Sequence, residues 1–379
     1  MKIMEKKPLR VLNIMADFKK GGIQAEVMYP ARLLDRSEVT FDALLLSDTV
    51  GFYEEEFSSY GDIYRIPLKR RKTRIGRVLS IFTNYVYLKR EMHRFFREHP
   101  GYDAVHARHI TYNAPCILAA KKAGIPVRIA HCAVDRPKGK FRDRAYITWY
   151  LAYCARVLRR HATHCFGVTR SAVEYLCGEG NGIVMKNPTI ALDKFDPDLY
   201  RDVQPDGKIH LLMVGSYGSR KNQKFAVDIL KELPPDATAT FIGYPRTPTD
   251  PYLPNLQNYV QELGLANRVR FLPQDADIPA EMAKATLLLI PSLQEGLPNV
   301  ALEAQAMGLP CFISDAVSDE CDCGLCSFHP LSIGPKGWAE RILRFVEERG
   351  YGKHRVDMSA WDNYKICLDY LEYWRGKPM

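Results

Sequence analysis

Short apolar runs and segments with helical periodicity alternate along the first half of the chain. The first run, Arg10 to Met15, is followed by a Gly-containing loop and a helical pattern from about Ile23 to Leu34. Further apolar runs lie at 40–47, 60–68, 102–108, 127–133 and 163–169, and the segments between several of them, such as 80–99, have helical character. Continuous apolar runs between helices are typical of buried parallel strands. This half therefore predicts a parallel sheet covered by helices.

The alternation pauses after about residue 190 and then restarts. Residues 191–207 are rich in Asp and Pro and poor in apolar side chains, which predicts a linker. Strand patterns follow at 209–217, 237–245, 268–274 and 285–292, with helical patterns at 221–233, 256–264 and 278–285. We therefore expect an α/β protein of two Rossmann-like, doubly wound domains, 1–190 and 208–359, facing each other across a cleft. A last helical segment within 360–379 is expected to complete the first domain.

Two acidic residues stand on either side of a Gly-Leu-Pro turn. Glu295 follows the apolar run at 285–292, and Glu303 lies eight positions later in a helix expected to begin just after Gly296 and to stop at Gly308. In open α/β sheets, ligands bind at the carboxyl ends of the strands, and helix N-termini there offer unpaired N–H groups to anions. Taken alone, the stretch fits equally well a Glu295 that complements the helix dipole and a Glu303 exposed to solvent.

Composition places the chain among ordinary globular proteins. Its 379 residues are enough for about two domains, with 46% hydrophobic and 26% charged residues. No apolar run reaches the roughly 18 residues of a membrane span, and the first residues show no signal-peptide core. We therefore expect a cytoplasmic protein. The ten cysteines form no regular secreted framework, so they are expected to be reduced thiols.

Positive charge is unevenly distributed. The net charge is +9, and Lys and Arg gather at 69–77 and at 136–160, where aromatic residues separate them. Basic helices with interleaved aromatic residues suit an anionic membrane surface or nucleic acid. Because no nucleic-acid-binding module accompanies the charge, we expect no nucleic acid and a peripheral contact with the inner face of the cell membrane. A solvated basic face is the open alternative.

One cysteine cluster could supply metal ligands. Cys321, Cys323 and Cys326 are followed by His329, but C-x-C-x2-C is not a common zinc spacing and no second half-site is apparent. A zinc site remains the alternative to three packed thiols.

Two Asp-x-Asp sequences could hold a divalent ion on a diphosphate. Asp277 of the pair Asp275–Asp277 directly precedes a helical segment, however, and suits a helix cap, while Asp196 and Asp198 lie in the predicted linker. We therefore expect no metal and no other cofactor.

The motifs, taken in order, resemble those of glycosyltransferase family 4, a retaining family of GT-B architecture, and especially its bacterial capsule and exopolysaccharide branch. The resemblance covers nearly the full length. The motifs that carry it are GGIQ, VHAR, RIAHC, VGSYGSRKNQ, ELGLANRVRFLPQDADIP, and the E-x7-E element Glu295–Glu303 followed by AMGLPCFISD.

The resemblance implies a donor site in the second domain. Glu303 would accept hydrogen bonds from the ribose hydroxyls of a nucleoside diphosphate sugar, and Glu295 would lie beside the sugar. The amides from Gly296 through Leu297 to Asn299 would point at the sugar and diphosphate. Lys221 would neutralise the departing diphosphate. The family usually has Arg where this chain has Ser216, and we expect Arg220 to reach the same phosphate.

In the first domain, the resemblance implies that the loop at Gly21 and Gly22 faces the donor phosphate and the acceptor. Without a Cβ, both glycines allow close backbone approach, although a tight turn alone would also explain them. His131 resembles the histidine of the family that approaches the donor sugar. His106 occupies a similar strand end and is the weaker candidate.

Together these residues predict a hexosyltransferase. It would move a sugar, with UDP-sugar as the expected donor, to a saccharide acceptor on a polyprenyl diphosphate, keeping the anomeric configuration. Catalysis would depend on stabilising the leaving diphosphate. The alternatives are a non-catalytic nucleotide-sugar-binding scaffold of a polysaccharide assembly complex, which Ser216 favours, and a sugar-nucleotide epimerase.

Overall fold

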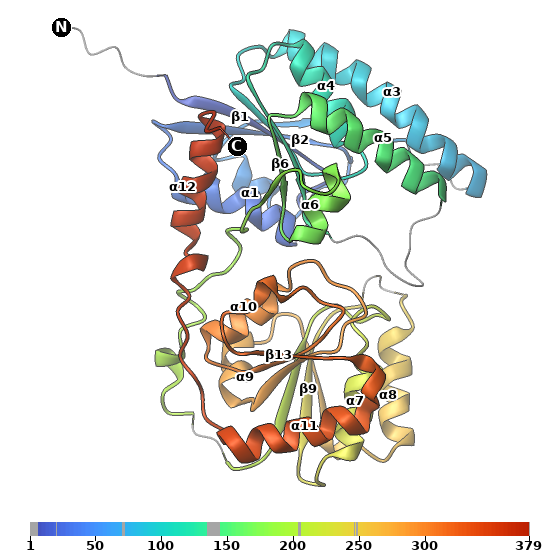
Figure 1. Cartoon of the computed structure of the whole chain (residues 1–379), viewed down its shortest axis with the longest axis vertical. Helices are drawn as coiled ribbons and strands as arrows, with labels where there is room; N and C mark the ends of the chain where they lie inside the picture. Colours follow the sequence, from blue (N-terminus) through green and yellow to red (C-terminus); the bar gives the residue numbers. More distant parts are fainter. Residues whose placement is uncertain are drawn as a thin grey trace, which may run out of the picture. The chain divides into compact units, whose positions relative to one another are not determined.

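The computed structural model describes residues 7–19, 21–69, 73–134, 145–203, 206–245, 247 and 249–378, without the side chains of residues 74, 75 and 77. The chain divides into two compact units. One comprises Met1–Thr189 with Trp361–Met379, and the other comprises Ile190–Ala360. Each unit is a parallel sheet covered by helices (Figure 1). The predicted α/β fold with two Rossmann-like domains is thus confirmed.

The first unit contains a seven-stranded sheet with the strand order β3-β2-β1-β4-β5-β6-β7. Its strands are β1 (Leu9–Met15), β2 (Val39–Leu45), β3 (Ile63–Arg65), β4 (Ala104–Ala107), β5 (Val127–Cys132), β6 (His164–Gly167) and β7 (Ile183–Val184). Its helices are α1 (Gly22–Leu33), α2 (Glu54–Phe57), α3 (Arg74–Glu98), α4 (Asn113–Lys122), α5 (Ala145–His161), α6 (Arg170–Cys177) and α12 (Asn363–Trp374). The strand order reverses between β1 and β4, which pair in parallel.

The second unit repeats this plan with six strands in the order β10-β9-β8-β11-β12-β13. They are β8 (His210–Val214), β9 (Thr238–Gly243), β10 (Val269–Pro273), β11 (Leu287–Ile290), β12 (Cys311–Ser314) and β13 (Cys326–His329). The helices are α7 (Gln223–Glu232), α8 (Tyr252–Glu262), α9 (Ile278–Lys284), α10 (Asn299–Ala306) and α11 (Gly334–Arg349). The order reverses between β8 and β11, so this unit has its own switch point, where α/β sheets bind ligands.

Three elements of this second unit, β12, β13 and α11, were not predicted from the sequence. Each strand is only four residues long, and Cys326–His329 mixes polar with apolar side chains. A strand this short gives little periodic signal. In α11, the buried Trp338, Ile342 and Val346 recur every four residues, so a helical period was present in the sequence.

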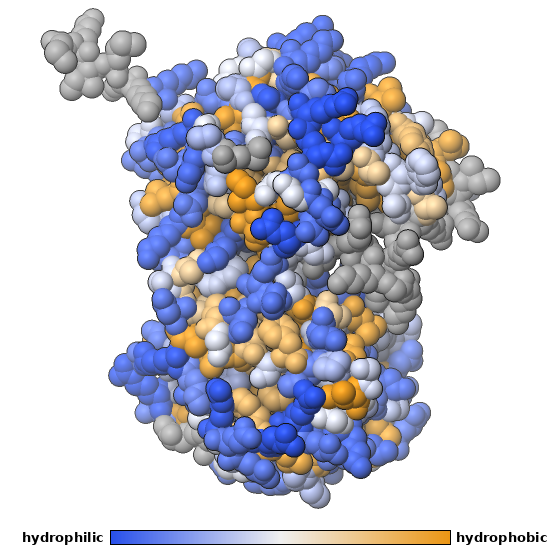
Figure 2. Space-filling model, in the orientation of Figure 1, coloured by the Kyte–Doolittle hydropathy of each residue, from blue (hydrophilic) through white to orange (hydrophobic). Residues whose placement is uncertain are grey.

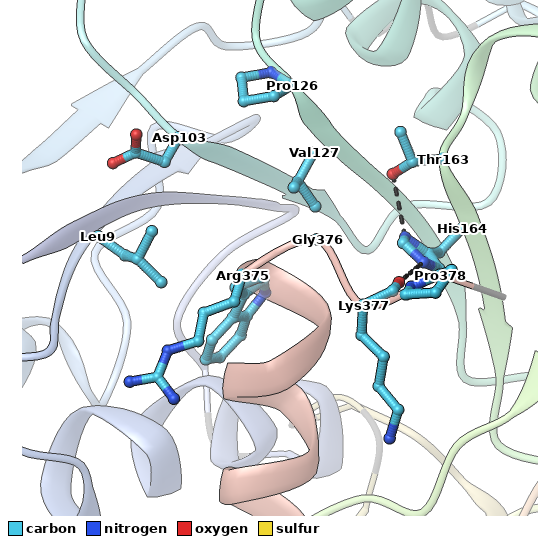
Figure 3. Close-up of a pocket in the computed structure, with 11 residues that line it drawn as sticks. Leu9, Asp103, Pro126, Val127, Thr163, His164, Arg375, Gly376, Lys377 and Pro378 are labelled. Carbon is cyan, nitrogen blue, oxygen red and sulfur yellow. Dashed lines mark hydrogen bonds between the residues drawn. The ribbon is translucent and has the colours of Figure 1, made fainter.

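The C-terminal segment runs along the amino ends of the first sheet. His164 Nε2 lies 2.8 Å from the carbonyl oxygen of Lys377, and the other ring nitrogen lies 3.0 Å from Thr163 Oγ1 (Figure 3). A pocket of about 630 Å³ opens here between the strand ends and the tail. Parallel sheets bind ligands at the carboxyl ends of their strands. This pocket lies at the amino ends, so it is not the predicted substrate-binding site.

Candidate functional site

The loops after β8 and β11 are joined to each other at the switch point of the second sheet. The amide of Leu293 donates to the carbonyl oxygen of Arg220 at 2.8 Å, and Asn222 Nδ2 donates to the carbonyl oxygen of Pro291 at 3.1 Å. Asn222 adopts a left-handed conformation, with φ of 61°, which Asn tolerates better than most residues. These contacts bring the residues predicted from both loops to one place.

Lys221 and Glu295 form an ion pair. Lys221 Nζ lies 2.7 Å from Glu295 Oε1, and the Ser292 hydroxyl donates to the same oxygen at 2.7 Å. The side chains are 23% and 14% exposed. The resemblance implied separate donor contacts for these two residues, whereas here they neutralise each other.

Gly215, the first residue after β8, makes room for the lysine. A Cβ at this position would lie 3.2 Å from Lys221 Cε, and the φ of Gly215 is +147°. Both the space and the backbone conformation therefore favour glycine.

Ser216 and Arg220 belong to the same loop. The carbonyl oxygen of Ser216 accepts a hydrogen bond from Gln223 Nε2 at 3.0 Å, which ties the loop to the first turn of α7. Arg220 is exposed beside Lys221. A phosphate contact by Arg220 remains a prediction.

Helix α10 begins at Asn299, two residues later than expected. Pro298 precedes it in an extended conformation, with ψ of 97°, and provides no side-chain cap. Gly296 and Leu297 therefore lie in the turn before the helix. The amides of its first turn are among the unpaired donors of a helix N-terminus and can face an anion.

Glu303 lies on α10. Burial raises the pKa of its carboxyl to about 7, and none of the described cations forms an ion pair with it. A desolvated carboxylate without a counter-charge gains much from hydroxyl donors, because hydrogen bonds to a charged acceptor are strong. This environment suits recognition of a polyol.

In the first unit, the loop after β1 turns tightly into α1. Gly22 is the first helical residue, and Gly21 precedes it in an extended conformation. The side-chain amide of Gln24 holds the loop by donating to the carbonyl oxygen of Asp17 at 3.2 Å and to its Oδ1 at 3.1 Å. The two glycines therefore form a tight turn between β1 and α1. This structural role is compatible with a second role in contacting a ligand.

His131, at the end of β5, belongs to a buried polar network rather than to an open surface. Its Nδ1 lies 2.9 Å from Oε1 of Glu26 on α1, and both side chains are 1% exposed. Arg108, after β4, donates from Nε to the same oxygen at 3.0 Å and from Nη1 to Asn13 Oδ1 at 2.6 Å. The Tyr370 hydroxyl of α12 also donates to Glu26 Oε1, at 3.0 Å.

The electrostatics of this network set the orientation of His131. Burial would raise the pKa of Glu26, but the electrostatic influence of His131 and Arg108 and their hydrogen bonds lower it to about 2. Because Glu26 is ionised, we assign a proton to Nδ1 of His131. Its Nε2 is buried and has no hydrogen-bond partner among the described residues. That nitrogen is the group of His131 that could meet a ligand.

His106 supports His131 from β4. The two rings stack, with centroids 5.3 Å apart and planes 16° from parallel. Nε2 of His106 lies 3.2 Å from the protonated Nδ1 of His131 and accepts from it, while Trp374 Nε1 of α12 lies 3.4 Å from His106 Nδ1. Burial, followed by the charge of Arg108, lowers the pKa of His106 well below its usual value. His106 is therefore neutral and packs against His131 within the core.

The sequence analysis missed Glu26, Arg108 and Tyr370. Arg108 belongs to the VHAR motif that carried part of the resemblance, and Glu26 lies five residues after Gly21. A charged residue directly after a short apolar strand and an acid within the first helix were the available signals. Tyr370 had no signal, because its contact with Glu26 spans 344 positions.

Within the described part of the chain, Glu26, His106 and His131 are the group that could hold a metal ion. The Arg108 guanidinium already pairs with the Glu26 carboxylate, and His131 lies on the same oxygen, which disfavours another cation there.

The Asp-x-Asp sequences have structural roles. Asp277 caps α9 by accepting from the amide of Ala280 at 3.0 Å, as predicted. Asp198 pairs with Arg201 and Arg355. All ten cysteines are free thiols, and His329 Nδ1 lies 2.8 Å from Arg341 Nη1 rather than beside a metal-binding trio.

Two family models match the chain, one in each unit. The model "Glycosyl transferase 4-like domain" matches residues 21–183, and the model "Glycosyl transferases group 1" matches residues 200–323. Together they cover most of the chain. The first match contains Glu26 and His131, and the second contains Lys221, Glu295 and Glu303.

Relatives agree over most of the length. The chain is 28% identical over 355 residues to "Putative glycosyltransferase EpsF" of Bacillus subtilis (strain 168), covering 88% of this chain and 87% of that protein. It is 25% identical over 319 residues to the Escherichia coli UDP-Gal:alpha-D-GlcNAc-diphosphoundecaprenol alpha-1,3-galactosyltransferase, covering 79% and 78%.

Among solved structures, Anabaena HepE in complex with UDP superposes with a TM-score of 0.69 at 17% identity, over 96% of each chain. This similarity supports the fold. The two family matches, the relatives and the two-sheet architecture lead to one conclusion: the chain belongs to the glycosyltransferases of GT-B architecture and is a hexosyltransferase built from a glycosyl transferase 4-like domain and a glycosyl transferases group 1 domain.

Proposed function

We propose that this chain is a retaining glycosyltransferase that moves a sugar from a UDP-sugar to a saccharide carried on a lipid diphosphate. The observation that carries the proposal is the placement of Lys221, Glu295 and Glu303 around the switch point of a group 1 domain. The E. coli relative uses UDP-galactose and a diphosphoundecaprenol-linked acceptor by its name, and HepE was solved with UDP. The motif resemblance supports a role in capsule or exopolysaccharide synthesis.

In this proposal, the donor replaces the ion pair between Lys221 and Glu295. Lys221 turns from Glu295 to the diphosphate, and Arg220 adds a second cation. The amides at the start of α10 face the same phosphates. Charge develops on the leaving diphosphate during transfer, so donors that are already oriented toward it stabilise the transition state more than the ground state.

Glu295, once free of Lys221, accepts hydrogen bonds from the sugar hydroxyls, while Glu303 accepts from the ribose. His131 offers Nε2 to the donor sugar, and Glu26 holds the ring in the required orientation. Lys221 supplies the charge compensation for which other transferases use a metal ion. Full activity in EDTA is therefore expected, and loss of activity restored by magnesium would contradict this part of the proposal.

The first experiment is a thermal-shift screen against UDP-, GDP-, ADP- and TDP-sugars. A ligand at about 100 times its dissociation constant should stabilise the protein by roughly 2.7 kcal/mol. A shift with the UDP-sugars that is lost in Glu303→Ala would support the donor assignment. No shift with any donor would contradict it.

Transfer is then measured with the donor so identified and a saccharide on a short-chain prenyl diphosphate. The anomeric proton coupling of the product in NMR distinguishes retention from inversion. Donor binding without transfer or hydrolysis would favour the scaffold alternative. An inverted product would disprove the retaining mechanism.

A further inference from the structure

Large hydrophobic side chains are exposed on one face of the first unit, formed by α3 and α5. They are Leu79 (47% exposed), Phe82 (49%), Val86 (68%), Trp149 (80%) and Tyr153 (53%). Residues 79, 82 and 86 follow each other at three- and four-residue spacing, as do 149 and 153, so each set forms one stripe on its helix. We call this surface the α3–α5 face.

Aromatic contacts join the two helices. The rings of Phe82 and Tyr150 lie 5.7 Å apart and those of Tyr85 and Tyr153 lie 5.9 Å apart. A groove of about 410 Å³ runs between the helices, with Val86 and Trp149 also in its walls. The groove is apolar and open to solvent.

Cations continue the same stripes toward the C-terminal ends of both helices. Lys89 follows Phe82 by seven positions, Arg156 follows Trp149 by seven, and Arg160 follows Tyr153 by seven. Seven residues are close to two helical turns, so each cation lies on the face of its aromatic partner. All three are exposed, and none forms an ion pair with an acidic residue within the described ranges.

The surrounding charge is mainly positive, since the two acids of α3, Glu91 and Glu98, pair with Arg90 and Arg94. The described sequences of α4 and α5 contain no Asp or Glu, and α4 ends with Lys121 and Lys122. Burial and then neighbouring cations lower the pKa of His93 on α3, as expected where positive charge accumulates. The basic residues at 70–72 and 136–144 lie outside the described residues and are not part of this argument.

The face has an apolar half and a cationic half. In the space-filling view, hydrophobic residues gather at the outer ends of α3 and α5 (Figure 2). A helix that connects parallel strands runs antiparallel to them, so the N-terminal, apolar halves lie toward the carboxyl edge of the first sheet. That edge carries Gly21, Gly22 and His131.

We propose that the α3–α5 face docks on an anionic phospholipid bilayer, with the aromatic half in the interface and the cationic half against the headgroups. Trp and Tyr side chains suit the interface, and Lys and Arg suit an anionic surface. Among the described residues no helix is long and apolar enough to cross a bilayer, so the contact is peripheral. The inference goes beyond the proposed function, which does not require the protein itself to bind lipid.

Tryptophan fluorescence provides a direct test. The chain has four tryptophans, and Trp338, Trp361 and Trp374 are at most 5% exposed, whereas Trp149 is 80% exposed. Vesicles of phosphatidylglycerol and phosphatidylcholine should shift the emission to the blue and protect it from iodide. Pure phosphatidylcholine vesicles should bind at least tenfold more weakly. No shift, or equal binding to both vesicles, would overturn the proposal.

Variants separate the two halves of the face. Arg156→Gln with Arg160→Gln should weaken vesicle binding roughly 30-fold, at about fivefold per lost cation. Phe82→Ser with Tyr153→Ser should weaken it at least tenfold, measured by vesicle sedimentation. The matched controls, on the other unit, are Lys336→Gln with Arg344→Gln and Leu199→Ser, whose side chains are also exposed. Controls that lose binding as strongly as the face variants would overturn the proposal.

Two further measurements test whether a second copy of the chain covers the α3–α5 face and whether the proposed function fails independently of membrane binding. Light scattering without vesicles would reveal a concentration-dependent dimer. If Trp149 fluorescence showed that this dimer buries Trp149, the proposal would be overturned in favour of a second copy of the chain. Transfer to a water-soluble acceptor should be unchanged in the face variants. Failure of the proposed function would appear as absent donor binding in the wild-type protein, whatever its vesicle binding.

Discussion

Each unit places a carboxylate next to a cation beside the switch point of its sheet, but the two pairs differ in burial. Glu26 and Arg108 are 1% and 2% exposed, and the same carboxylate oxygen also meets His131 and Tyr370. Glu295 and Lys221 are 14% and 23% exposed, with Ser292 as the additional hydrogen-bond donor.

The buried pair stabilises the fold, whereas the partly exposed pair is accessible to a change of partner. A buried charge is tolerated only when its partners are all present, because removing one leaves the other desolvated. A partly exposed pair contributes little to stability and can exchange partners at small cost. Similar residue types at similar positions can therefore serve structure in one unit and binding in the other.

The largest expected effect is on folding, at Glu26. Glu26→Ala leaves Arg108 buried without its counter-charge, and we expect about 3–5 kcal/mol of lost stability in chemical denaturation. Tyr370→Phe, which removes one hydrogen bond to the same carboxylate, should lose about 1.5–3 kcal/mol. Glu38→Gln, in a surface pair with Arg375, is the control and should change little. If Glu26→Ala were as stable as the control, the network would not be structural.

The second effect is on transfer rather than folding, at Lys221. Lys221→Met should leave the unfolding midpoint nearly unchanged, since its pair is partly exposed. It should lower kcat by about 10²–10³-fold, the scale for removing one pre-oriented donor from a developing charge. Steady-state kinetics beside thermal unfolding measure both. A large stability loss with little change in kcat would reverse the roles assigned to the two pairs.

The third effect is on donor affinity, at Arg220 in the second unit. If Arg220 replaces the family Arg absent at Ser216, Arg220→Ala should weaken donor binding by roughly one to two decades, as loss of a charged hydrogen bond does. Isothermal titration with the donor gives the affinity. Lys224→Ala, on the exposed start of α7, is the control. Equal affinities for wild type and Arg220→Ala would disprove the replacement.

The smallest effect is the pH dependence of donor binding through Glu303. Its pKa is raised to about 7 by burial, so the carboxylate that should accept the ribose hydroxyls is lost as pH falls below 7. Donor affinity should drop by up to tenfold per pH unit there. Folding stability follows the opposite sign, because a raised pKa favours the folded state at low pH and this contribution is lost as pH rises through about 7. Glu303→Gln should flatten both profiles between the ordinary pKa of 4.5 and about 7, and a profile still as steep as that of the wild type would exclude Glu303 as its source.

Much of the candidate site in the second unit could be predicted from the sequence because each of its motifs is local in the chain. Glu295 and Glu303 lie on one turn and one helix, and Lys221 follows a recognisable strand and loop. The ion pair between Lys221 and Glu295 was not predicted, since it depends on which strands neighbour each other. The order β8-β11 brings those loops together although 74 positions separate the residues.

By itself, the sequence determined the alternation of strands and helices and the two sheets, because apolar periodicity acts within a few residues. It also determined which loops carry the acids, cations and glycines of the candidate donor site. Only the tertiary structure decided that His131 is buried against Glu26, Arg108 and α12, and that the stripes of α3 and α5 form one face. Those outcomes depend on packing between segments far apart in the chain, where burial rather than local pattern sets the charge state and partner of each side chain.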